Sequence, residues 1–154
     1  MASNGRICSY RQSILYSAAG VAGLSVIRFT PIGGQDRSKP LPYDPTSSIT
    51  EQVQASIQVS LKNLRTTYID CYLLHSPLNT MWRTLEAWEA LKRLQDDGVV
   101  RLIGVSNTYD VETLKALDTQ GGRKPNVVQN RWYEGNGFDK AVVYYCKENS
   151  IHYE

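Results

Sequence analysis

The sequence has few of the residues that tie a chain to a disulfide framework or a metal. Its 154 residues contain three cysteines and two histidines. Cys8, Cys71 and Cys146 are odd in number, lie far apart and form no C-x-x-C pair. This pattern indicates free thiols in a reducing compartment and therefore predicts a cytoplasmic protein. Because no metal-ligand spacing is present either, no metal site is expected.

Long apolar runs and clusters of like charge are missing too. The most apolar stretch, residues 14–27, is too short to cross a bilayer. It follows two arginines, as in a signal peptide, but it runs directly into an expected strand, which favours a place in the domain. The net charge is +2 and the basic residues are scattered. We therefore expect neither nucleic acid nor a membrane as a partner.

The sequence does contain a regular alternation of strands and helices. A strand precedes Pro31, and residues 31–46 are an irregular loop because four prolines and two glycines interrupt regular structure there. Helical spacing of apolar residues follows over residues 49–64, with Ser48 and Glu51 as a capping box. The further expected strands are residues 68–74, 100–105, 127–132 and 151–153. The further expected helices are residues 85–94, the segment between Asp110 and Gly121, and residues 138–147.

This alternation predicts an α/β fold with a parallel sheet and helical crossovers. A doubly wound sheet and a (β/α)8 barrel both have this element order. No G-x-G-x-x-G motif follows any strand, which disfavours a dinucleotide-binding fold of the Rossmann type. Since a whole barrel typically needs about 250 residues, the expected architecture is a partial (β/α)8 TIM barrel.

Polar side chains follow several of the expected strands. His75 ends the strand in YIDCYLLHSP, on the same face as Cys71 and Leu73, whereas Asp70 faces the other way. Other strands carry polar residues at or near their carboxyl ends: Arg28 and Thr30, Ser106 and Asn107, and Gln129 and Asn130. Parallel strands bring such residues to one rim, where a barrel has its active site.

Each of these residues also has a structural explanation. A histidine at a strand end is often a hydrogen-bonded core residue. Ser106-Asn107 suits a turn that enters a helix, and residues 130–132 suit a solvated strand end. Asp70 suits an ion pair on the opposite side of the sheet. A hydrolase or lyase with His75 as base has little support, because no nucleophile motif accompanies it.

Four segments resemble the aldo-keto reductase family. SLKNLRTTYIDCYLLHSP is similar to the signature around the family's catalytic histidine, and WEALKRLQDDGVVRLIGVSNT to the next helix and strand. KPNVVQNRWYE resembles the strand with the family's glutamine, and RFTPIGGQD resembles the strand and loop with its catalytic lysine, in a form typical of fungal members. The resemblance covers residues 25–154 and leaves residues 1–24 unmatched. It implies that the chain contains a barrel truncated at both ends, from about strand 3 to the start of strand 7.

The resemblance also implies a chemistry. Members of the family use NADP(H) to pass a hydride to a small aldehyde or ketone. His75 matches the histidine that orients the carbonyl group. The residues that match the binders of the nicotinamide carboxamide are Ser106, Asn107 and Gln129. Arg28 stands at the place of the catalytic lysine and keeps its charge, although its planar guanidinium has another geometry.

The family's catalytic aspartate and tyrosine would precede the strand of Arg28. No aspartate occurs before Asp36, and Tyr10 and Tyr16 lie in the unmatched segment. We therefore expect an NADPH-dependent carbonyl reductase with impaired catalysis. The alternative is a non-catalytic, degenerate barrel fragment that acts as a binding or regulatory partner.

Overall fold

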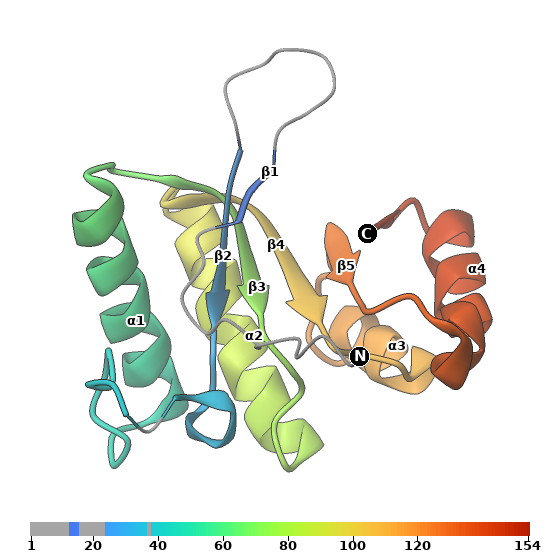
Figure 1. Ribbon diagram of the computed structural model, residues 1–154, viewed down its shortest axis with the longest axis horizontal. Coiled ribbons are helices and arrows are strands. Elements are labelled where there is room, and N and C mark those ends of the chain that lie inside the picture. Colours follow the sequence, from blue (N-terminus) through green and yellow to red (C-terminus); the bar gives the residue numbers. More distant parts are fainter. Residues whose placement is uncertain (1–12, 16–23, 37) are drawn as a thin grey trace, which may run out of the picture.

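A computed structural model describes residues 13–15, 24–36 and 38–154 of the chain. Within these residues the strands form one sheet in the order β1 to β6, with four α-helices (Figure 1). The strands are β1 (Ser13–Leu15), β2 (Leu24–Phe29), β3 (Ile69–Leu74), β4 (Val100–Ser106), β5 (Val127–Gln129) and β6 (His152–Tyr153). The α-helices are α1 (Ile49–Leu64), α2 (Met81–Asp96), α3 (Val111–Thr119) and α4 (Lys140–Glu148), with 3-10 turns at Ile32–Gly34 and Glu134–Asp139.

Strands β2 to β6 are all parallel, and a helix or loop-and-helix connection joins each to the next. This arrangement confirms the predicted α/β class. Strand β1 was not predicted: it pairs with β2 in the antiparallel sense, with Ser13 opposite Val26. A strand of three residues is too short to show the alternation of apolar and polar residues on which strand prediction depends.

The helices begin and end where their capping residues indicate. Ser48 and Glu51 form the predicted capping box at α1, and the Asp110 carboxylate accepts from the first-turn amides of α3. Gly98 follows α2 with a φ of 72°, a left-handed conformation that glycine adopts without strain. The prediction of a helix from residue 138 was wrong, because Phe138 and Asp139 have φ values of 58° and 50° and α4 begins at Lys140. No helix in the described part of the chain is long and apolar enough to cross a membrane.

The two faces of the sheet have different roles. Alternate side chains of a strand point to opposite faces. One face packs against the helices and forms the main core, to which the strands contribute Phe29, Tyr72, Leu74, Ile103, Val105 and Val128. The other face, here called the inner face, carries a smaller apolar cluster of Val26, Cys71, Leu73 and Val127. By the same alternation, Arg28, His75 and Gln129 belong to the inner face.

Ser25 and Asp70 join β2 to β3 near the amino ends of these strands. The backbone N–H and the hydroxyl of Ser25 both donate to Asp70 Oδ2, at 3.0 and 2.9 Å, and Asp70 N donates to Ser25 Oγ at 3.0 Å. Arg101 Nη1 of β4 lies 3.1 Å from Asp70 Oδ1. The prediction that Asp70 is an ion-pair partner away from the candidate site is therefore confirmed.

Candidate functional site

The carboxyl ends of β2 to β5 bring together all five residues that the sequence singles out. Arg28 lies in β2, Ser106 ends β4 and Gln129 ends β5, while His75 and Asn107 directly follow β3 and β4. His75 continues the β2–β3 ladder, because its N–H donates to the Phe29 carbonyl at 2.9 Å. The parallel sheet thus places these residues on one rim.

Asn107 links three of the strand ends. Its Nδ2 donates to the His75 carbonyl at 2.7 Å and contacts Ser106 Oγ at 3.3 Å. Its backbone N–H donates to the Gln129 carbonyl at 3.2 Å. The φ of Asn107 is 49°, a left-handed conformation that asparagine adopts more readily than most residues. The Asn107 backbone therefore leaves the sheet sharply here, while its side chain reaches across to β3.

Gln129 lies between a cation and an anion. Its Oε1 accepts from an Nη of Arg28, and its Nε2 donates to Glu154 Oε1 at 2.7 Å. A guanidinium only donates and a carboxylate only accepts hydrogen bonds. The orientation of the Gln129 amide is therefore determined by its two neighbours.

The electrostatics of the rim favour a neutral imidazole. Burial, and then the positive charge of Arg28, lower the pKa of His75. Burial also lowers the pKa of Arg28, and the carboxylate of Glu154 opposes this effect. A guanidinium still keeps its proton in proteins. At neutral pH the site consequently combines a fixed cation with an uncharged histidine that has one N–H to donate.

The turn at Ile32–Gly34 lies beside His75. A methyl group added to Gly34 would lie 3.6 Å from His75 Nδ1, so the turn at Ile32–Gly34 approaches the imidazole closely. The Tyr43 hydroxyl and Gln35 Nε2 both donate to the Thr30 carbonyl at 2.7 Å. These bonds hold the proline-rich loop against the end of β2.

The thiol of Cys71 is buried on the inner face. Burial raises the pKa of Cys71 to about 12, and Glu154 adds to this effect. The thiolate is the reactive form of cysteine, so a thiol of this kind is a poor nucleophile at neutral pH. Cys71 and Cys146 are free, as predicted, whereas Cys8 lies outside the described residues. Residues 13–15, 24–36 and 38–154 contain no group of three side chains suited to hold a metal ion.

Three residues that matter to this rim were missed or misinterpreted. The sequence allowed Asn130 to be interpreted as part of a solvated strand end, but its side chain is buried and only 8% exposed. The neighbouring Arg131 and Trp132 are exposed. Asp139 and Glu154 gave no sequence signal. Their partners, Asn130 and Gln129, lie 9 and 25 residues away, too far for a local pattern to reveal. Tyr10 and Tyr16, considered as candidates for the family's tyrosine, lie outside the described residues.

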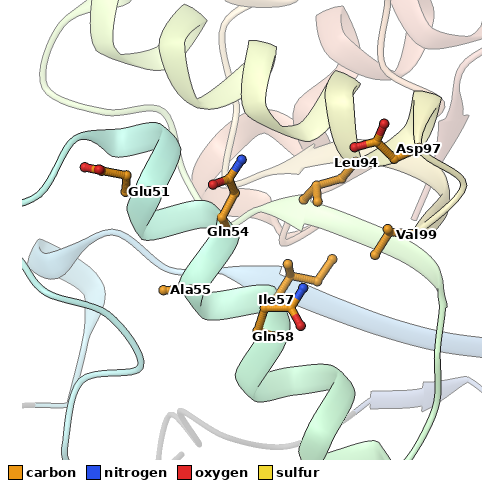
Figure 2. A pocket seen from close by; sticks show the side chains of 8 residues that line it. All are labelled: Glu51, Gln54, Ala55, Ile57, Gln58, Leu94, Asp97 and Val99. Carbon is orange, nitrogen blue, oxygen red and sulfur yellow. The ribbon is translucent and has the colours of Figure 1, made fainter.

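A surface hollow lies on the helical side of the molecule (Figure 2). Its lining comes from α1, the end of α2 and the start of β4: Glu51, Gln54, Ala55, Ile57, Gln58, Leu94, Asp97 and Val99. None of the five strand-end residues belongs to it. The candidate site is therefore the rim and not this hollow.

The chain is similar in sequence to known proteins of one family. The sequence profile of the Aldo/keto reductase family matches residues 41–153. The chain is 35% identical over 104 residues to the glyoxal reductase of Bacillus subtilis, and 30% identical over 114 residues to the NADPH-dependent alpha-keto amide reductase of Saccharomyces cerevisiae. These matches cover 68% and 71% of this chain, and the chain spans 36% of the length of each relative.

Solved structures show the same likeness. An aldo/keto reductase from Brucella melitensis superposes with a TM-score of 0.62 at 30% identity, over 68% of this chain and 39% of the other. A Bombyx mori aldo-keto reductase in complex with NADP gives a TM-score of 0.59 at 27% identity, over 68% and 36% of the two chains. The sheet is thus the counterpart of part of a TIM barrel, and the chain belongs to the aldo/keto reductase family.

Proposed function

We propose that this rim is the carbonyl- and nicotinamide-facing part of an NADPH-dependent carbonyl reductase site. The observation that carries the proposal is the continuous set of hydrogen bonds from His75 through Asn107 and Gln129 to Arg28. It groups the orienting histidine and the carboxamide binders expected from the family. The names of the relatives support small carbonyl compounds as the substrate class, because they include glyoxal reductase and methylglyoxal reductase.

His75 would orient the substrate. Burial and Arg28 lower its pKa, so the imidazole is neutral and offers one N–H to a carbonyl oxygen. A neutral donor positions the oxygen without giving up its proton. Bound NADPH would supply the hydride that reduces the carbonyl carbon. The turn after β2 lies beside the imidazole at Gly34, where an added Cβ would come 3.6 Å from His75 Nδ1.

The residues at the ends of β4 and β5 fit a nicotinamide carboxamide. No hydrogen bond within the described residues engages Asn107 Oδ1, so it can accept from the carboxamide NH₂. The Gln129 amide retains one lone pair and one N–H after its bonds to Arg28 and Glu154. Ser106 Oγ lies beside Asn107 and is nearly buried. These donors and acceptors complement an amide on the ligand.

Catalysis would be weak in this chain. Arg28 stands at the place of the family's lysine, and one of its N–H groups donates to Gln129. A guanidinium does not substitute for an ammonium at a site that needs a compact charge. A positioned general acid typically contributes about 10²–10⁴-fold, and the family's tyrosine has no sequence match in this chain. We therefore propose slow carbonyl reduction.

The contact between Arg28 and Gln129 also favours a second candidate function. If the guanidinium holds the amide permanently, the rim binds NADPH or a related ligand without turning over. This would be one form of the non-catalytic role, a degenerate barrel fragment that acts as a binding or regulatory partner, that the sequence also allows. The same assay separates the two functions.

The test is to titrate the chain with NADPH by fluorescence and then to follow NADPH oxidation with glyoxal or methylglyoxal. We expect saturable binding and a slow oxidation that His75→Ala abolishes while the Kd for NADPH stays within about twofold. Binding without any oxidation would support the non-catalytic function. A folded wild-type chain that binds no NADPH would overturn both.

A further inference from the structure

We infer that Asn130 and Asp139 are positioning residues that hold Asn107 in the site. Neither residue belongs to the rim itself. Both are buried, with 8% and 6% of their surface exposed, and they lie behind the end of β5. The inference concerns how the rim is built, and it rests on the proposed function only where Asn107 is taken to contact NADPH.

Asn130 fastens the segment that follows β4 to the segment that follows β5. Its Oδ1 accepts from Thr108 N at 2.9 Å and its Nδ2 donates to the Thr108 carbonyl at 2.7 Å. A side-chain amide thus pairs with both polar backbone groups of one residue. Thr108 is only 1% exposed, so water cannot replace these bonds.

Asp139 holds Asn130 in place. Asn130 Nδ2 also donates to Asp139 Oδ2 at 2.6 Å, and the Tyr153 hydroxyl donates to the same oxygen at 3.0 Å. A carboxylate only accepts, so it can receive only the NH₂ side of Asn130 and thereby directs Oδ1 to Thr108 N. Asp139 itself has a φ of 50°. The loop after β5 adopts a costly backbone conformation at the residue that provides this carboxylate.

The hydrogen bonds to the Thr108 backbone also restrain the neighbouring Asn107. The two residues are adjacent, and Asn107 is held in a left-handed conformation with a φ of 49°. On one side, its N–H donates to the Gln129 carbonyl; on the other, both backbone polar groups of Thr108 are bound to Asn130. Without the two hydrogen bonds between Asn130 and Thr108, the turn would relax. The Asn107 side chain would then lose its fixed position against the His75 carbonyl.

Asn126 provides a matched control. Its Oδ1 accepts from Ile103 N at 3.0 Å and from Gln95 Nε2 at 3.1 Å, so it also links β4 to the chain beside β5. However, it acts at the amino end of β5 and in the middle of β4. Asn126→Ala and Asn130→Ala both remove an asparagine that bonds to β4 or the residues following it, and only the second is close to Asn107.

The test is backbone amide hydrogen exchange of the full chain, measured residue by residue by NMR under conditions in which each variant is folded. We expect Asn130→Ala to speed exchange of the Asn107 amide at least tenfold relative to wild type. We expect Asn126→Ala to speed exchange of the Ile103 amide instead. Equal acceleration at Asn107 in both variants would mean a general loss of stability and would overturn the inference, as would no acceleration in Asn130→Ala.

If Asn130→Ala does not fold, Asp139→Asn decides the question. This change keeps the shape and removes the charge, which weakens the hydrogen bonds to Asp139. We expect at least threefold faster exchange at Asn107, and unchanged exchange there would overturn the inference. NADPH titration of the folded variants adds a second measurement: the Kd should rise for Asn130→Ala or Asp139→Asn and not for Asn126→Ala. If wild type binds no NADPH, the proposed function fails, while exchange alone still decides the positioning role.

Discussion

The guanidinium of Arg28 in β2 contacts the side-chain amide of Gln129 in β5, although two strands lie between them. In a flat sheet, three inter-strand spacings would separate these strands by about 14 Å. A sheet that curves around its inner face, as the wall of a barrel does, brings the two side chains closer together than a flat sheet would. An arginine, with its long and planar side chain, can span this curvature and still donate to an amide oxygen.

Removing the charge of Arg28 should raise the pKa of His75. The guanidinium is a nearby cation that disfavours the imidazolium, so Arg28→Met relieves part of the shift, while the larger effect of burial remains. An NMR titration that follows the His75 ring signals will measure this change directly.

Arg101→Met is the matched control for this experiment. Arg101 is also an arginine of the sheet, but it pairs with Asp70 at the opposite strand ends. Its loss should leave the His75 titration unchanged. An unaltered pKa in Arg28→Met would contradict the arrangement of charges described above.

The stability of the chain should fall on mild acidification because of His75. Its folded-state pKa lies below the ordinary value of 6.5, so the unfolded chain binds the proton more readily. The contribution of His75 to stability is thus complete above about pH 6.5 and is lost as the pH falls towards the folded-state pKa. Urea unfolding of wild type and His75→Gln at pH 7.5, 6.5 and 5.5 will measure it. The stability of wild type relative to His75→Gln should fall as the pH falls; a constant difference would refute the prediction.

A methyl group in the turn beside His75 should disturb the imidazole when it is added at Gly34 and not when it is added at Gly33. A Cβ on Gly34 would lie 3.0 Å from Thr30 Cγ2 and 3.6 Å from His75 Nδ1, whereas a Cβ on Gly33 would meet nothing within 4 Å. We expect Gly34→Ala to shift the NMR signals of the His75 ring and Gly33→Ala to leave them in place. Equal shifts in both variants would show that the loop does not approach the imidazole as described.

A side chain at Gly104 should break the inner face. An added Cβ would collide with the Val127 carbonyl oxygen and would lie 2.7 Å from Leu73 Cδ2. Because the first of these is backbone of the neighbouring strand, Gly104→Ala should lower the free energy of unfolding by at least about 1–3 kcal/mol, the range for overpacked cores. Chemical denaturation measures this loss, with Gly33→Ala as the variant expected to remain near wild type.

Local sequence patterns predicted much of this fold and only part of its site. The apolar repeat of α1 and the caps at Ser48 and Asp110 are signals within one or two helical turns, and the structure has them where expected. The rim was predicted because parallel strands must end together. The contact between Arg28 and Gln129 was not predicted. It joins residues that are 101 positions apart in the sequence, and it depends on how the sheet curves.

The loop after β5 shows why the prediction of a helix from residue 138 was wrong. Residues 138 and 139 look helical by composition, but both have positive φ values and Asp139 is used as a buried acceptor for Asn130. A tertiary hydrogen bond has overridden local preference there. A contact of this kind produces no periodic pattern in the sequence. For this reason the sequence was compatible with a solvated strand end at Asn130, although Asn130 is buried.

The bonds between Ser25 and Asp70 have a consequence at the far end of the strands. Side chains alternate between the two faces, so sliding β2 by one residue against β3 would turn Arg28 away from His75 and into the helical layer. Ser25 donates from both its backbone and its side chain to one carboxylate, and this pairing is satisfied in a single alignment. A misaligned intermediate would leave that carboxylate without these donors. The pairing of Ser25 with Asp70 thus favours the alignment that places Arg28 on the inner face, although neither residue touches the rim.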